Sequence, residues 1–180
     1  LTIPEGLTIR AIAALIAEKG FGEAAEIRRL AHDPDFITSL DLDVTSLEGY
    51  LFPDTYHLPR GIRERALLTL MVRTLREHYT EATAAQAKAL GLSQHEVLTM
   101  ASLIETEAQV QEERPVISAV YHNRLKRDMR LQCDPTVIYA LGEKFDGNIR
   151  KRDLRIDSPY NTYRYKGLPP GPIANSGLRS

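Results

Sequence analysis

The stretch SQHEVLTMASLIETEAQ, residues 93–109, has the sequence features of a long, largely buried helix. Ser93 and Glu96 match the S-x-x-E capping box, which predicts that the helix begins at about Gln94. On a helical wheel of about 100° per residue, the apolar side chains form one broad arc. Its centre is formed by Val97, Ala101, Ile104 and Ala108, with Leu98 on one side and Met100 and Leu103 on the other. The residues on the opposite side are Thr99, Ser102 and Thr106.

Two carboxylates, Glu105 and Glu107, fall inside this apolar arc. A buried carboxylate is costly unless it is paired, hydrogen-bonded or protonated. Burial would also raise its pKa, as a general acid at neutral pH requires. The alternative is structural, because both lie near the end of the helix, where it can emerge into solvent, and Arg114 could pair with either one. The residues alone do not choose between these interpretations or between the two glutamates.

The composition is that of a soluble globular chain, with 43% hydrophobic and 26% charged residues in 180. The formal net charge of -1 offers no basic field for nucleic acid, so neutral partners are expected. Cys133 is the only cysteine, which excludes an intramolecular disulfide and a cysteine-built zinc site. The five histidines include no i, i+4 pair, so support for a metal site is weak. No run approaches the roughly 20 apolar residues of a membrane span.

The rest of the chain predicts further helices separated by segments rich in glycine and proline. Helices are expected at residues 9–19, 21–33, 63–89 in two pieces, 113–127 and 135–141, the last with Asp134 as its N-cap, and residues 33–40 are expected to form a helix or a turn. Short strands are expected in LTIPEG (1–6), DTYHL (54–58), MRLQC (129–133) and YNTYRY (160–165). This mixture predicts an α+β fold, predominantly helical, with a small mixed or antiparallel sheet.

Several segments, taken together and in this order, resemble the YceG-like family of endolytic murein transglycosylases. They are LTIPEG (1–6), LEGYLFPDTY (47–56), ASLIETEA (101–108), LQCDPTVIYALG (131–142) and YNTYRYKGLPPGPIAN (160–175). The resemblance covers nearly the whole chain. It implies a bacterial lytic transglycosylase that cuts peptidoglycan glycan strands internally, between MurNAc and GlcNAc, and leaves 1,6-anhydromuramoyl ends.

The resemblance also implies a setting for the enzyme. Its substrate would be peptidoglycan glycan strands, with cell-wall synthesis or division proteins as further partners, no nucleic acid, no metal and no cofactor. The full-length protein would lie on the extracytoplasmic face of the plasma membrane, held by a single-pass anchor outside this chain. Residues 1–40 would be the end of a LysM-like subdomain or its junction, and residues 41–180 a YceG-like catalytic domain shortened at its C-terminal end.

Site residues follow from the matching segments. The resemblance assigns the catalytic glutamate to Glu105, the first of the two in ASLIETEA, and leaves the role of Glu107 open. The residues it places near the cleavage site are Glu48, Gln132, Asp134, Asn161, Thr162 and Tyr163. Structural alternatives remain for three of them: a helix cap for Asp134, a turn for Asn161 and core packing for Tyr163.

One glutamate suffices for this chemistry, because the 6-hydroxyl of the substrate's own MurNAc serves as the nucleophile. Glu105 would first protonate the glycosidic oxygen and then take the proton from that hydroxyl. One alternative is a two-carboxylate muramidase that uses water, with Glu105 as acid and Glu48 as base. Another is a non-catalytic glycan-binding or division-scaffold module. A pyridoxal-phosphate lyase is rejected, because the lysines lie in polar contexts and no phosphate-cradling glycine loop accompanies them.

Overall fold

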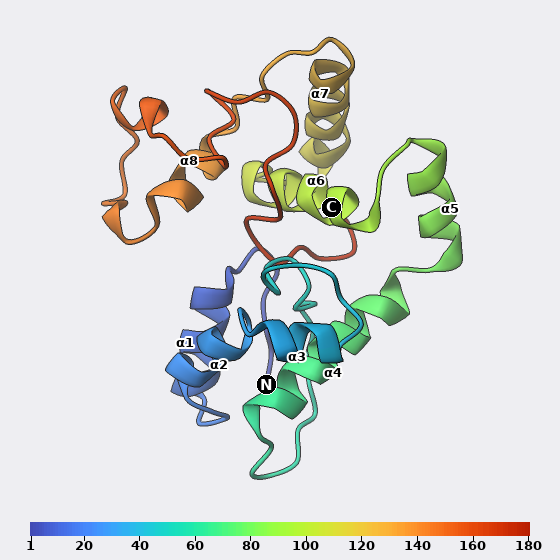
Figure 1. Ribbon diagram of the computed structural model, residues 1–180, viewed down its shortest axis with the longest axis vertical. Coiled ribbons are helices and arrows are strands. Elements are labelled where there is room, and N and C mark those ends of the chain that lie inside the picture. The colour runs from blue at the N-terminus through green and yellow to red at the C-terminus, as the bar shows by residue number, and fades with distance from the viewer.

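The computed structural model describes residues 1–180 as a set of α-helices joined by irregular segments (Figure 1). The helices are α1 (Ile9–Glu18), α2 (Ala24–Leu30), α3 (Pro34–Ser39), α4 (Glu64–His78), α5 (Glu81–Ala89), α6 (Gln94–Glu107), α7 (Arg114–Lys126) and α8 (Asp134–Leu141). Three short 3-10 helices are η1 (Gln111–Glu113), η2 (Gly142–Lys144) and η3 (Asp153–Arg155). None of these helices combines the length and the apolar character needed to traverse a bilayer.

The larger hydrophobic core lies in the lower body of Figure 1, residues 1–78, where α1 to α4 surround the irregular segment 47–56. It contains 22 buried residues, from Ile3 to Leu98. Helix α1 turns its apolar face toward this core, and Thr8 caps the helix by accepting a hydrogen bond from the Ala11 N–H at 3.3 Å. Residues 1–40 therefore share a core with the residues that follow them, and the expected domain boundary at residue 40 stays a prediction.

The smaller core lies in the upper body, residues 94–180, around α6 and α7. Its buried members are Met100, Leu103, Ile104, Tyr121, Leu131, Cys133 and Ile173. Helix α6 contributes to both cores, since Leu98 belongs to the larger cluster and Met100, two residues later, to the smaller one. This helix therefore connects the two bodies.

Helix α6 begins at Gln94 with both bonds of the capping box formed, as the sequence predicts. The side opposite its apolar arc is also buried, because the segment around Ile173 covers it. The Ile173 N–H donates to Ser102 Oγ at 3.0 Å. Thr99 Oγ1 donates to the carbonyl of His95, and Ser102 Oγ to that of Thr99, both at 2.7 Å. These hydroxyls are buried without cost because each finds a carbonyl of the same helix.

The expected α+β fold is wrong, because the structure contains no β-sheet. Residue pairs bridge at only two isolated places, Thr2 with Thr55 and Leu7 with Asn175. In the expected strand 129–133, Gln132 has a φ of 52°, which ends an extended conformation. The expected strand 160–165 is a turn, in which Asn161 Oδ1 accepts a hydrogen bond from the Tyr163 N–H at 3.0 Å.

The helices lie where they are expected, except that α2 is shorter at both ends than the expected 21–33 and that α8 starts differently. Asp33 caps α3 by accepting from the Phe36 N–H at 3.0 Å, and Pro34 follows in the first turn. Asp134, however, is the first residue of α8 and not its N-cap, a position that Cys133 occupies without a side-chain bond. The Asp134 carboxylate is engaged elsewhere, because it accepts a hydrogen bond from the Tyr163 hydroxyl at 2.5 Å.

Candidate active site

Glu105 lies in the last turn of α6, and its side chain is only 7% exposed. Three donors hold its carboxylate. Arg114 Nη2 donates to Oε1 at 2.8 Å, while the Ser180 hydroxyl and the Gly177 N–H donate to Oε2 at 2.7 Å and 3.2 Å. Since both oxygens are engaged from different segments, the orientation of the carboxylate is fixed.

Arg114, the first residue of α7, completes this arrangement. Its side chain is 13% exposed, and its Nε donates to the Ser180 hydroxyl oxygen at 2.9 Å. The apolar arc on α6 suggested a neutral carboxyl group, with an ion pair to Arg114 as the alternative, and the structure contains the ion pair. Both carboxylate oxygens of Glu105 and two nitrogens of Arg114 thus take part in one hydrogen-bonded cluster with Ser180.

A pocket of about 330 Å³ opens beside Glu105, between the end of α4 and helices α5, α6 and α7. Ala101 and Ile104 line it from α6, and Gly177 and Ser180, which both bind the Glu105 carboxylate, line it from the C-terminal segment. The polar side chains in its wall include those of His78, Tyr79, Gln86, Ser118 and His122. A concave site with apolar walls and a few polar groups is typical of binding sites for small organic groups.

Glu48 lies in a different environment, buried between α1 and the C-terminal segment and 6% exposed. Its Oε1 accepts hydrogen bonds from the Ile9 N–H and from Asn175 Nδ2, each at 2.9 Å, and Tyr139 donates to Oε2 at 3.4 Å. Desolvation by burial raises the pKa of Glu48 to about 7, against the lowering effect of these hydrogen bonds.

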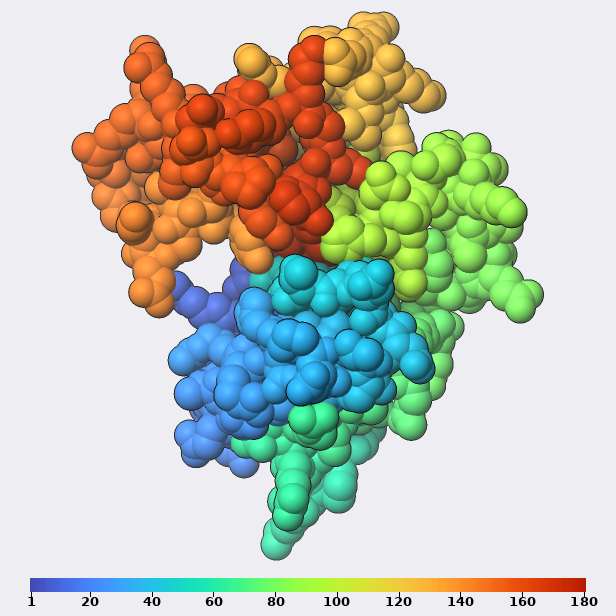
Figure 2. All heavy atoms as spheres, viewed as in Figure 1, coloured from blue at the N-terminus to red at the C-terminus, as the bar shows by residue number.

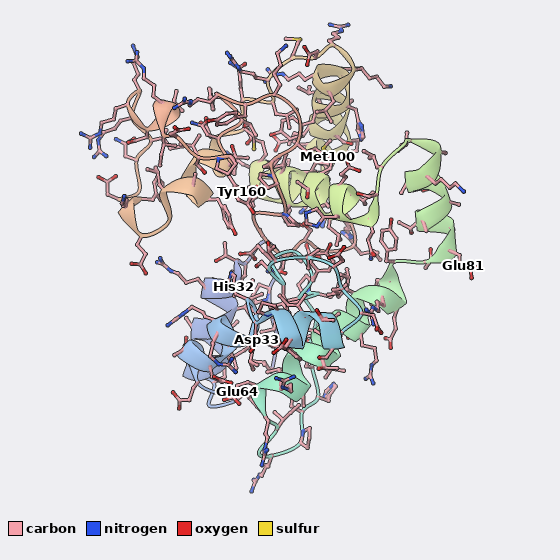
Figure 3. All side chains as sticks on the ribbon, viewed as in Figure 1. His32, Asp33, Glu64, Glu81, Met100 and Tyr160 are labelled. Carbon is pink, nitrogen blue, oxygen red and sulfur yellow. The ribbon has the colours of Figure 1, made fainter.

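Glu48 lines a second pocket of about 330 Å³, which shares no residue with the pocket beside Glu105. Its wall includes His95, Tyr160 and the residues Pro170, Gly171 and Pro172 of the proline-rich loop. Tyr160, labelled in Figure 3, comes from the irregular segment that passes α6. Glu48 therefore lines one pocket, whereas Glu105 is held by two residues, Gly177 and Ser180, that line the other.

Replacing Glu48 with Gln tests its protonation. Because the folded-state pKa is raised from 4.5 to about 7, the folded chain retains a proton that the unfolded chain has released between these pH values. This contribution to stability is complete below pH 4.5 and is lost as the pH rises through 7, a change on the order of 3 kcal/mol. Gln has no such proton, so we expect denaturant titrations to show the wild type losing stability relative to Glu48→Gln between pH 5 and pH 8. A constant difference over that range would contradict the prediction.

The other five expected residues gather at the start of α8, beside Glu107. Asn161 and Thr162 are buried and hold the backbone: Asn161 Nδ2 donates to the Ile156 carbonyl at 2.8 Å, and Thr162 Oγ1 accepts from the Cys133 N–H at 2.9 Å. The three that reach solvent are Gln132, Asp134 and Tyr163.

Glu107 is exposed, and its Oε2 lies 3.6 Å from Cys133 Sγ. Burial raises the pKa of the Cys133 thiol to about 12, so this cysteine stays a neutral thiol. The structure thus brings Gln132, Asp134 and Tyr163 together near Glu107, at the end of α6. Glu107 is two residues after Glu105 in the sequence. Glu48 contacts the same helix α8 one to two turns further along, through Tyr139.

Three residues that hold the two glutamates were not expected from the sequence: Asn175, Gly177 and Ser180. Asn175 is the last residue of the family-like segment 160–175 and Gly177 follows it, but the resemblance assigns neither a role. No spacing rule connects Gly177 and Ser180 with Glu105, because more than 70 residues separate them from it along the chain. Arg114 was considered only as one cation among others.

Figure 2 shows a notch on the left of the molecule, between the segment around residue 145 and helix α1. The Arg10–Glu143 ion pair spans this notch at 3.4 Å, with both side chains exposed. An exposed pair of this kind contributes little to stability. The structure has no cluster of histidine, cysteine, aspartate and glutamate with the make-up of a metal site.

Two curated relatives, both named endolytic murein transglycosylase, match this chain. The protein from Bacillus subtilis is 40% identical over 196 residues, which cover all of this chain and 54% of the relative. The protein from Streptococcus pneumoniae strain D39 is 34% identical over 203 residues, covering 99% of this chain and 36% of the relative. The chain thus spans about half or less of the length of these relatives.

The fold is similar to that in the crystal structure of a yceG-like protein from Listeria monocytogenes. The TM-score is 0.90 at 38% sequence identity, over 99% of this chain and 64% of that one. The family model described as the YceG-like family matches residues 1–180. With the match extending over its whole length, the chain belongs to the YceG-like family.

Proposed function

We propose that this chain is the catalytic part of an endolytic murein transglycosylase, with Glu105 as its catalytic residue. The observation that carries the proposal is a carboxylate fixed by three donors, at 2.7 to 3.2 Å, two of which, Gly177 and Ser180, line a pocket. The relatives from Bacillus subtilis and Streptococcus pneumoniae carry the name of this activity. A position that is rigid and beside a binding pocket is what proton transfer to a bound substrate requires.

In the proposed reaction, the carboxyl group of Glu105 gives its proton to the glycosidic oxygen between MurNAc and GlcNAc. The bond from MurNAc C1 to that oxygen breaks, and positive charge develops at C1. The 6-hydroxyl oxygen of the same MurNAc then bonds to C1, while its proton passes to the Glu105 carboxylate. The products are a free GlcNAc 4-hydroxyl and a 1,6-anhydromuramoyl end, and no water is consumed.

The ion pair with Arg114 suits the second half of this cycle, in which Glu105 must be an anion that accepts a proton. For the first half, Glu105 must be neutral. With a neutral Glu105, the ion pair with Arg114 is no longer present. Arg114 then retains a hydrogen-bond partner in the Ser180 hydroxyl.

Product analysis tests the proposed reaction. Peptidoglycan digested by the chain in water enriched in oxygen-18 is expected to give fragments with 1,6-anhydromuramoyl ends and no heavy oxygen at the new ends. Mass spectrometry distinguishes these from the reducing ends made by hydrolysis. Reducing ends that carry one heavy oxygen would contradict the transglycosylase and support a muramidase. The placement of Glu48 on a separate pocket gives that muramidase no support.

We also propose the cellular setting that the family resemblance implies. The full-length protein acts outside the cytoplasm, held at the membrane by an anchor that is not in this chain, and residues 1–40 form the end of a LysM-like subdomain or its junction with the catalytic domain. Division or cell-wall synthesis proteins are its further partners. Fractionation of cells that express the full-length protein is expected to place it in the membrane fraction, and its recovery as a soluble cytoplasmic protein would contradict this setting.

A further inference from the structure

The net charge of -1 conceals an uneven distribution of charge along the chain. Residues 1–113 contain 10 lysines and arginines against 18 aspartates and glutamates. Residues 114–180 contain 13 lysines and arginines against 6 aspartates and glutamates. The part of the chain that begins with α7 is therefore strongly cationic, while the part that precedes it is acidic.

The cations converge from three segments onto one surface. We call this surface the cationic edge, made of residues 126–130, 150–157 and 164–166. Lys166 pairs with Asp128, which joins the third segment to the first. Arg164 pairs with Asp157 at 3.5 Å and donates to the Arg155 carbonyl at 3.3 Å, which joins the third segment to the second. In Figure 3, side chains tipped with nitrogen project along this upper edge of the molecule.

The cationic edge contains more positively charged side chains than its own acidic side chains can pair with. Its acids are all paired: Asp128 with Lys166, Asp153 with Arg152 and Asp157 with Arg164. Five exposed cations on the edge have no ion-pair partner in the structure: Lys126, Arg127, Arg130, Lys151 and Arg155. The surface therefore has a net positive field that extends into solvent.

Helix stability explains only part of this arrangement. Lys126 and Arg127 lie at the C-terminal end of α7, where cations offset the helix dipole. Arg130 and Lys151 lie outside the helices and stabilise no helix end in this way, and Arg155 is in the last turn of η3, which has only three residues. Their convergence on one edge is the pattern expected of a surface that meets a molecule with several negative charges.

We propose that the cationic edge binds the carboxylates of the peptide side chains on the murein strand. This inference rests on the proposed function, since murein supplies both the glycan for the pocket and the peptide carboxylates. Helix α7 links the two places: Arg114 at its start contacts Glu105, and Lys126 at its end begins the cationic edge, about 18 Å further along the helix axis. A strand with sugars in the pocket beside Glu105 thus has neighbouring peptides within reach of the edge.

The test compares two triple variants, each made together with Glu105→Gln so that strands remain uncut. The edge variant is Lys126→Gln, Arg127→Gln and Arg130→Gln. The matched control removes three exposed cations from elsewhere in the chain: Arg28→Gln, Arg60→Gln and Lys88→Gln. The ligands are murein with its peptides, glycan strands freed of peptides by an amidase and then capped as methylamides at the lactyl carboxylates that this exposes, and vesicles containing an anionic phospholipid.

The edge variant is expected to bind peptide-bearing murein roughly tenfold more weakly than its parent, because each exposed charge pair contributes a small increment. The control should bind like the parent, added salt should reduce the difference, and peptide-free strands should show none. Equal binding of both triple variants would overturn the proposal, as would an equal loss on peptide-free strands. Tighter binding of the parent to anionic vesicles than to murein would also overturn it and would assign the edge to a membrane surface.

The outcome of the binding comparison does not depend on whether the proposed cleavage reaction is correct. If Glu105→Gln alone left cleavage unchanged, the proposed mechanism would fail, while the binding comparison would still measure the cationic edge. If cleavage depends on Glu105 but the edge variant binds normally, only the assignment of the edge is lost.

Discussion

Replacing Glu105 with Gln is expected to lower the rate of strand cleavage by roughly 10³-fold, the usual contribution of a general acid and base. Gln has nearly the same shape, and its carbonyl oxygen still accepts hydrogen bonds from the Gly177 N–H and the Ser180 hydroxyl. It has no proton to give to the glycosidic oxygen and cannot accept one afterwards. The measurement is the initial rate at which soluble anhydromuropeptides are released from purified peptidoglycan.

Glu112→Gln is the matched control, because Glu112 is exposed and has no partner in an ion pair. It removes one negative charge near the start of α7 and should leave the rate within about twofold, as is usual for an exposed surface site. Circular dichroism shows whether each variant is folded. If folded Glu105→Gln kept a tenth or more of the wild-type rate, Glu105 would not be the proton donor.

Replacing Asn175 with Ala is expected to lower the free energy of unfolding by about 2 to 4 kcal/mol, because it leaves the buried Leu51 N–H without a partner and removes one of two hydrogen bonds from the Leu7 carbonyl and from Glu48 Oε1. Asn175 is fully buried. Its Oδ1 accepts from the Leu51 N–H, and its Nδ2 donates to the Leu7 carbonyl and to Glu48 Oε1, all at 2.9 Å. The alanine methyl group satisfies none of these three partners.

Urea denaturation of the wild type and the variant measures this loss. Asn123→Ala serves as the control, since Asn123 is exposed on α7 and its removal should change stability by no more than about 0.5 kcal/mol. A loss below about 1 kcal/mol for Asn175→Ala would mean that water replaces the lost hydrogen bonds, and that Asn175 does not hold the two bodies together.

The helices were largely predictable from the sequence, because their signals are local. Ser93 and Glu96 lie three residues apart and form both bonds of the capping box at the start of α6. Asp33 and Pro34 mark the start of α3 in the same way. The family resemblance selected Glu105 as the catalytic residue, a choice that helical geometry left open and that stays a prediction until the variants are measured.

The sheet failed as a prediction because pairing between strands depends on contacts that a short apolar segment does not encode. The turn at Asn161 and the positive φ of Gln132 satisfy the backbone in other ways. The surroundings of Glu105 were equally hidden, since the Gly177 and Ser180 donors come from the far end of the chain. The excess of positive charge in residues 114–180 is present in the sequence, but the net charge of -1 for the whole chain does not reveal it.

Helix α6 belongs to both hydrophobic cores, through Leu98 in one and Met100 in the other, and Glu105 lies one to two turns further along the same rigid rod. Any hinge motion between the two bodies must therefore also swing the carboxylate of Glu105 relative to the segment that faces it. A long polymer that binds both bodies at once can change their relative orientation in this way, whereas a short fragment bound in one pocket cannot.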